Sequence, residues 1–169
     1  MASISIIVAS SGNNVVLAKA IAEVALSMGH TASLVPLADH ELPLFTVERE
    51  QQGPRPERLT GLVDALRGSD AWVVLAPEYN GSFPPRLNNA VAWLSREGED
   101  FRALFRDRPV ALGTHSGGGG QHVVMAMRMQ FAYVGCNVVG RSLVVNKNKP
   151  VNADSVEQVL RSLVQGVSA

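Results

Sequence analysis

Residues 75–94 of this chain read LAPEYNGSFPPRLNNAVAWL, and the pattern changes twice along them. They open as the end of an apolar run, pass through a turn rich in Pro, Asn and Gly, and leave with apolar residues at helical spacing from Leu87 to Leu94. The pattern predicts a strand, a loop and a helix. In an open parallel sheet, ligands bind beyond the carboxyl ends of the strands, so this loop is a candidate binding site.

The residue types in this loop are those of a ligand-binding turn. Asn80 and Gly81 tolerate positive φ and can turn successive N–H groups toward one point, while Tyr79 offers a flat apolar face with a polar tip. Pro84 and Pro85 suit the first turn of the outgoing helix. A plain strand-to-helix turn without a ligand is the alternative. The candidate ligand contacts are Pro77, Glu78, Tyr79, Asn80 and Gly81.

Similar strand, loop and helix units recur along the chain. Pro36, near the end of the second apolar run, suits an edge strand because proline cannot donate to a neighbouring strand. Alternating units of this kind predict an α/β fold with a parallel sheet and helices on both faces. Strands are expected at residues 3–10, 31–37, 71–76, 109–114 and 137–145, and helices around residues 17–28, 59–66, 87–94, 121–133 and 156–164.

Two longer connections interrupt this alternation. Residues 38–56 are polar and end in Gly and Pro, and loops of this length tend to be functional. Residues 97–108 are charged, with Phe101, Leu104 and Phe105 as apolar anchors, and predict a loop or a short helical turn.

A polar loop follows the first strand and precedes a helix. Its residues can present hydroxyls, amide side chains and free N–H groups to an anion, and the helix dipole adds to the attraction. The alternative is that Asn13 or Asn14 only caps the helix. The loop has neither the G-x-G-x-x-G spacing of a dinucleotide fingerprint nor the pattern of a P-loop NTPase. Its candidate ligand contacts are Ser10, Ser11, Gly12, Asn13 and Asn14.

Four consecutive glycines follow the fourth strand. Glycine is costly to order, so such a run suits a place where backbone approaches a flat ligand closely, with a flexible connector as the alternative. For the sheet we choose the strand order 2-1-3-4-5, a common order in doubly wound folds, which brings the loops after strands one, three and four together at one edge. The candidates in this third loop are His115, Ser116, Gly117 and Gly118.

Composition restricts the partners. The 169 residues are expected to form one domain, residues 1–169, and their 15 basic and 15 acidic side chains give no excess of positive charge for nucleic acid. The N-terminus has no positively charged leader, and no apolar stretch approaches the ~18 residues that span a bilayer, so we expect a cytoplasmic protein and no membrane partner. Cys136 is the single cysteine, lies in an apolar run and is expected to be inert.

The central segment closely resembles the motif of the NAD(P)H-dependent FMN reductase family. That family carries Pro-Glu-Tyr-Asn-Gly-Ser, then Pro, then a Leu-x-Asn-Ala helix, which here are Pro77 to Ser82, Pro84 or Pro85, and Leu87 to Ala90. The loop after the first strand matches the family's phosphate loop by position, but it is shorter, lacks the usual Arg and looks more like the corresponding loop of flavodoxins. Residues 41–45 resemble the Leu-Pro-Leu-aromatic segment of the family, a wall for the site or a packed surface loop.

The resemblance implies a flavodoxin-like three-layer α/β/α sandwich with a five-stranded parallel sheet in the order 2-1-3-4-5. It also implies that FMN is bound noncovalently as the cofactor and that NADPH or NADH is the co-substrate. The expected electron acceptor is a small molecule such as a flavin, a quinone or an azo compound. Because the cofactor carries the chemistry, no catalytic protein residue and no metal are expected. Donor and acceptor would use one open flavin face in turn, which predicts a ping-pong mechanism.

Two other functions stay open at this point. A flavodoxin-type electron carrier would bind FMN without oxidising NAD(P)H, although flavodoxins are commonly acidic and the formal net charge here is zero. A flavin-free binding protein on the same fold is the other alternative, because the first loop departs from the family's pattern.

Residues 121–133 predict a helix that is apolar around most of its circumference. Such a helix is expected to be buried on two sides, by its own sheet and by a partner subunit. We therefore expect a homodimer or homotetramer that associates partly through residues 123–131. The apolar residues are Val123, Val124, Met125, Ala126, Met127, Met129 and Phe131.

Overall fold

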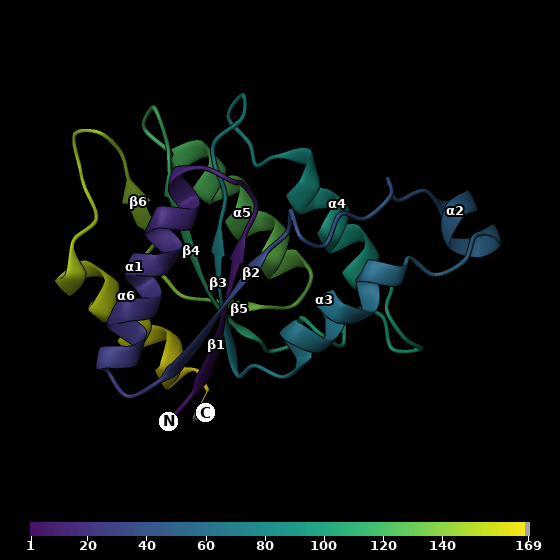
Figure 1. Ribbon diagram of the computed structural model, residues 1–169, viewed down its shortest axis with the longest axis horizontal. Helices are drawn as coiled ribbons and strands as arrows, with labels where there is room; N and C mark the ends of the chain where they lie inside the picture. The colour runs from purple at the N-terminus through teal and green to yellow at the C-terminus, as the bar shows by residue number, and fades with distance from the viewer. Residues whose placement is uncertain (168–169) are drawn as a thin grey trace.

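The computed structural model describes residues 1–167 as a parallel sheet between two layers of helices (Figure 1). The strands are β1 Ser3–Val8, β2 Thr31–Pro36, β3 Ala71–Leu75, β4 Pro109–His115, β5 Asn137–Val138 and β6 Leu143–Val145. The helices are α1 Asn13–Ser27, α2 Val47–Gln52, α3 Glu57–Arg67, α4 Pro85–Leu94, α5 Gln121–Tyr133 and α6 Ala153–Gln165. The sheet order β2-β1-β3-β4-β5 confirms the expected flavodoxin-like order, with β6 also paired to β4.

The central strand β3 is apolar and buried along its whole length, as expected for a strand covered on both faces of the sheet. Along β3, Trp72 and Val74 point into a core shared with α3, α4 and α5, while Val73 and Leu75 point into a second core beneath α1 and α6. β2 lies at the edge as predicted, with Pro36 opposite Val8 at its end.

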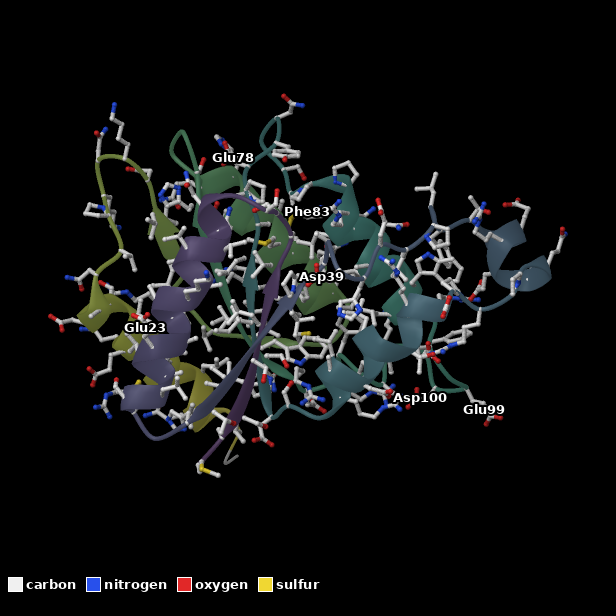
Figure 2. All side chains as sticks on the ribbon, in the orientation of Figure 1. Glu23, Asp39, Glu78, Phe83, Glu99 and Asp100 are labelled. Carbon is white, nitrogen blue, oxygen red and sulfur yellow. The ribbon has the colours of Figure 1, made fainter. Side chains whose placement is uncertain are left out.

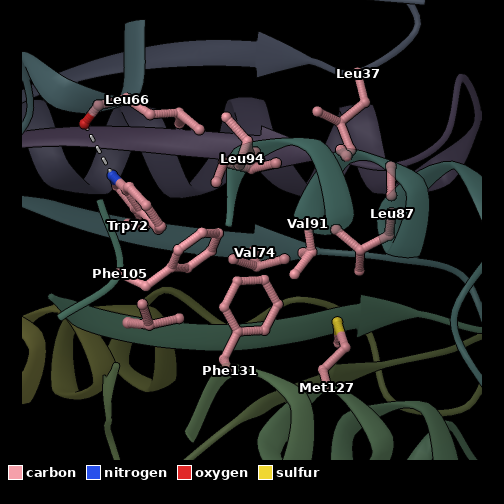
Figure 3. Packing of buried hydrophobic residues seen from close by; sticks show 14 of the residues in the cluster. Leu37, Leu66, Trp72, Val74, Leu87, Val91, Leu94, Phe105, Met127 and Phe131 are labelled. Atoms are coloured by element: carbon pink, nitrogen blue, oxygen red, sulfur yellow. Dashed lines mark hydrogen bonds between the residues drawn. The ribbon is translucent and has the colours of Figure 1, made fainter. Parts of the chain in front are cut away.

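The larger core contains an aromatic cluster (Figure 3). The rings of Trp72 and Phe105 meet edge to face with centroids 5.5 Å apart, and Trp72 Nε1 donates to the Leu66 carbonyl at 3.2 Å. Phe105 anchors the connection of residues 97–108, which has turns and no helix. Phe101 is not an anchor, because its ring is exposed and lies under the Arg96 guanidinium.

The expected fifth strand is interrupted, and this corrects the five-stranded prediction. β5 and β6 both pair with β4, but the pairing register advances by two residues between Val138 and Leu143, so the residues between them leave the sheet. Arg128 on α5 donates to the Val139 and Gly140 carbonyls at 2.9 and 3.1 Å. This guanidinium satisfies backbone carbonyls at the place where the strand is interrupted.

The long connection after β2 contains a helix that its sequence did not indicate. α2 is capped by the Thr46 side chain, which accepts from the Arg49 N–H at 3.1 Å, and none of its residues is buried. It lies at the far right of Figure 1, away from the sheet. The six residues have no apolar periodicity, so the pattern gave no signal. Within residues 1–167, no helix has the length and hydropathy needed to cross a membrane.

Candidate functional site

The loops after β1, β3 and β4 come together at one edge of the sheet, at the top of Figure 1. A pocket of about 560 Å³ lies between the first two loops, the start of α4 and His115. Its lining residues are Ala9, Ser10, Ser11, Gly12, Asn13, Asn14, Pro77, Tyr79, Pro84, Pro85, Arg86 and His115. Most of the contacts predicted from the sequence are among them, and the exceptions are Glu78, Asn80, Gly81, Ser116, Gly117 and Gly118.

Asn14 connects the first loop to the third. Its Oδ1 accepts from the His115 N–H at 2.7 Å and its Nδ2 donates to the His115 carbonyl at 3.3 Å. The residue is only 2% exposed, so the amide works as a buried cross-link between two loops that are far apart in the sequence. Sequence reasoning placed Asn14 in the site but did not find this partner.

The first loop keeps hydrogen-bonding groups available for a ligand. Gly12 occupies the position that caps α1 and no side chain makes a capping bond there, so neither Asn13 nor Asn14 is a helix cap. Ser10 Oγ is buried and has no hydrogen-bond partner within residues 1–167. A buried hydroxyl without a partner is costly, and a polar ligand in the pocket would satisfy it.

The central loop is a tight turn. Asn80 and Gly81 have φ values of 51° and 77°, and Tyr79 and Ser82 exchange backbone hydrogen bonds of 2.7 and 3.0 Å. Positive φ at both central residues is the type I′ geometry, which confirms the positive φ expected for this pair. The turn leaves the Tyr79 side chain exposed at the mouth of the pocket.

Glu78 points away from this pocket. Its Oε2 accepts from the Val123 N–H at 3.3 Å, so the carboxylate lies beside the start of α5 (Figure 2). A carboxylate at a helix N-terminus satisfies a free N–H and interacts favourably with the helix dipole. The side chain therefore joins the central loop to α5, and only the backbone of Glu78 is left to contact a ligand.

The glycine run has open space where side chains would stand. A Cβ built on Gly117 or Gly118 meets no atom within 4 Å. The run is nevertheless held in place, because Ser116 Oγ accepts from the Gly118 N–H at 3.2 Å and Asn146 donates to the Gly118 carbonyl at 3.4 Å. Ser116, Gly117 and Gly118 do not line the pocket and lie beside it at the same edge.

The charges around the pocket suit an anion. Among the lining residues there is no carboxylate, and Arg86 is their one guanidinium. Arg86 lies inside the central segment but was not among the predicted contacts, because the motif specifies the residues on either side of it and not Arg86 itself. Cys136 is remote from the pocket, and burial raises the pKa of its thiol to about 12, which keeps it protonated and unreactive near neutral pH.

Residues 41–45 do not line this pocket. Asn89 on α4 donates to the carbonyls of Leu42 and Pro43 at 3.2 and 3.1 Å and accepts from the Phe45 N–H at 2.8 Å, and Trp93 Nε1 donates to Pro43. The segment is thus packed on α4, as one of the two alternatives predicted. A larger hollow of about 920 Å³ lies farther along, beside α2, and its lining mixes acidic and basic residues.

Replacing Asn14 with Ala is expected to lower the free energy of unfolding by about 1–3 kcal/mol, because the His115 N–H and carbonyl both lose their partner. Thermal and urea unfolding measure this loss. Asn13→Ala is the control, since this neighbouring side chain is exposed and makes no hydrogen bond within residues 1–167. Equal stability of both variants would contradict the cross-link.

Comparisons with known proteins find relatives that match most of the chain. A quinone reductase from Escherichia coli K12 is 27% identical over 152 residues, which cover 86% of this chain and 78% of that protein. An FMN-dependent NADH:quinone oxidoreductase from Shewanella loihica is 26% identical over 81% of this chain and 79% of that protein. The solved structure of FerB, a flavoenzyme NAD(P)H:(acceptor) oxidoreductase from Paracoccus denitrificans, has the same fold, with a TM-score of 0.75, 19% identity and coverage of 99% and 96% of the two chains.

The family assignment rests on a match that covers most of the chain. The model of the NADPH-dependent FMN reductase family matches residues 2–150, which contain all three loops and the segment from Leu75 to Leu94. The chain therefore belongs to the NADPH-dependent FMN reductase family of oxidoreductases.

Proposed function

We propose that this protein is an NAD(P)H-dependent reductase that binds FMN noncovalently and reduces small acceptors, quinones foremost. The observation that carries the proposal is the pocket between the loops after β1 and β3, where the buried Ser10 hydroxyl has no partner within residues 1–167 and no carboxylate repels an anion. The quinone reductase and NADH:quinone oxidoreductase relatives support quinones as the acceptor class. Flavin and azo acceptors are further candidates.

The chain's residues would bind and orient the cofactor. Ser10 to Asn14, at the start of α1, would hold the phosphate with hydroxyl and N–H donors. Backbone groups of residues 78–81 and 116–118 would contact the edge of the flavin ring, and the open side of the glycine run leaves space for it. FMN, when bound, supplies the hydride-transfer chemistry, so no protein acid or base is required. The whole chain would form one FMN-binding domain, and a cytoplasmic location stays a prediction.

One titration series tests the proposal. Flavin-free protein is titrated with FMN and with FAD, then mixed with NADH or NADPH without oxygen, and finally given a quinone. We expect FMN to bind more tightly than FAD, because one short loop at a helix N-terminus suits one terminal phosphate. We also expect bleaching by the nucleotide, recovery with quinone, and parallel double-reciprocal lines. Absence of flavin binding would favour a flavin-free binding protein, and binding without bleaching would favour an electron carrier.

We also propose that the protein is a homodimer that associates through α5. The structure changes which residues would take part, because Val123, Val124, Met127 and Phe131 are buried in the chain's own core. The opposite face of the same helix exposes Met125, Met129 and Tyr133, whose exposed fractions are 58%, 71% and 74%. These side chains are spaced four residues apart, so they form one apolar stripe that a second copy could cover.

Replacing Met129 with Glu is expected to raise the dimer dissociation constant by about tenfold or more, because association would bury a charge in the centre of the stripe. Sedimentation measures the mass at micromolar concentrations, with and without FMN. Leu26→Glu is the control, since Leu26 is an exposed apolar residue on α1, on the other face of the sheet. A monomeric wild-type protein would rule out the homodimer.

A further inference from the structure

Arg86 is the one permanently charged side chain of the pocket that the first loop helps to form. Ser10 to Asn14 are all neutral, and no Lys or other Arg lines the pocket. A phosphate monoester carries about −1.5 to −2 charges near neutral pH. Hydroxyl and N–H donors alone would leave most of that charge without a counter-charge, so a bound phosphate would attract a guanidinium at the pocket wall.

The Arg86 side chain is free to take this role. Within residues 1–167 it makes no ion pair and no hydrogen bond, and it is exposed. Other arginines are already paired: Arg96 binds Glu50 at 2.6 Å and Arg106 binds Asp100 at 2.7 Å. No carboxylate lines this pocket. Glu41 borders a neighbouring hollow of about 300 Å³ together with Arg86, but it makes no ion pair with Arg86 within residues 1–167.

The fold fixes the base of this side chain beside the first loop. Arg86 is the second residue of α4, directly after Pro84 and Pro85, whose ring-locked φ angles restrict the entry of the helix. The Leu87 N–H donates to the Pro84 carbonyl at 3.0 Å, and Leu87 is buried in the core. The backbone of Arg86 is thus held at the pocket while its long side chain can reach across it.

A second observation on the same pocket points to a polar ligand. Ser10 Oγ lies in the lining, is buried and has no partner within residues 1–167. The pocket therefore combines a hydroxyl without a partner with a guanidinium without a counter-ion. Both would be satisfied by one anion that accepts hydrogen bonds from each of them.

We infer that Arg86 binds the phosphate of FMN across the pocket from Ser10 to Asn14. This inference rests on the proposed function, because it takes FMN as the ligand. The guanidinium donates to phosphate oxygens from the α4 side, and the first loop donates from the α1 side. Arg86 is then a residue that selects a phosphorylated flavin and discriminates against riboflavin, which lacks the charge.

The test compares FMN and riboflavin binding in flavin-free wild-type protein, Arg86→Ala and Arg86→Lys. Arg67→Ala is the matched control, because Arg67 is exposed at the end of α3 and lines no part of the pocket. We expect Arg86→Ala to weaken FMN binding by about 10- to 100-fold and to leave riboflavin binding nearly unchanged. Arg86→Lys should recover part of the loss, since it keeps the charge but not the forked geometry. The FMN dissociation constant of Arg86→Ala should also depend less on salt.

Each other outcome overturns the inference in a distinguishable way. Equal losses for FMN and riboflavin, with a lower melting temperature, would assign Arg86 to the fold or the ring site. Unchanged FMN affinity together with a raised KM for NADPH would show that the Arg86 guanidinium binds NADPH and not the FMN phosphate. No change in either would leave Arg86 without a role. Wild-type protein that fails to bind FMN would overturn the proposed function itself, and this inference with it.

Discussion

Asn13→Asp is expected to weaken FMN binding by about 10- to 300-fold while leaving riboflavin binding almost unchanged. Asn13 is the first residue of α1 and lines the pocket assigned to the phosphate. A carboxylate there would lie a few ångströms from the phosphate, and an effective dielectric of about 20 gives a repulsion on the order of 2–4 kcal/mol per charge pair. Solvent screening lowers this to about 1.4–3.4 kcal/mol, which corresponds to the stated loss of affinity.

The same substitution is expected to stabilise the flavin-free protein. The first turn of α1 has no acidic residue, so a carboxylate in place of the Asn13 amide would put a negative charge where the helix dipole favours one. Near an exposed helix N-terminus this is worth about 0.3–1 kcal/mol. We therefore expect stability to rise while FMN affinity falls. This combination distinguishes repulsion of the phosphate from damage to the fold, because a damaged loop would lower both stability and affinity.

Calorimetric titration with both ligands, together with melting temperatures, measures these effects. Gln51→Glu is the control for the added charge, because Gln51 is exposed on α2, far from the three loops. Equal losses for FMN and riboflavin would show that the ring site or the fold had changed. Unchanged binding of both ligands would remove Ser10 to Asn14 from the phosphate site.

Gly120→Ala is expected to lower the free energy of unfolding by about 2–5 kcal/mol. Gly120 has φ +71°, a conformation that costs a residue with a Cβ about 1–2 kcal/mol. The new Cβ would also lie 2.8 Å from Thr114 Cγ2 and 3.2 Å from Val144 Cγ1. Thr114 is fully buried, so the clash cannot be relieved by moving a side chain into solvent.

This substitution is also expected to weaken FMN and riboflavin binding to a similar degree, because the clash would displace the glycine run and not the phosphate loop. Gly119→Ala is the control: its Cβ would meet no atom within 4 Å, and its φ is not in the left-handed region. Denaturant unfolding and flavin titration of both variants measure the contrast. If Gly120→Ala were as stable as Gly119→Ala, the left-handed conformation would not be required at that position.

The sequence alone determined the features that depend on neighbouring residues. Apolar runs and helical spacing predicted the α/β class, because burial on one or both faces leaves a periodic pattern. Pro36 predicted the edge position of β2, because proline cannot donate to a neighbouring strand. The positive φ of Asn80 and Gly81 and the start of α4 at Pro84-Pro85 also followed from local chemistry. A few consecutive residues are enough to specify each of these features.

Only the tertiary structure decided which groups meet across the site. The bond between Asn14 and His115 joins residues 101 positions apart, and the turn of Glu78 toward α5 joins residues 45 positions apart. Arg128 on α5 likewise donates to the Val139 carbonyl in the interruption between β5 and β6. The entry of Arg86 into the pocket depends on how α4 packs beside the first loop. No local pattern encodes these contacts, because each depends on the packing of elements whose separation in space is set by the whole sheet.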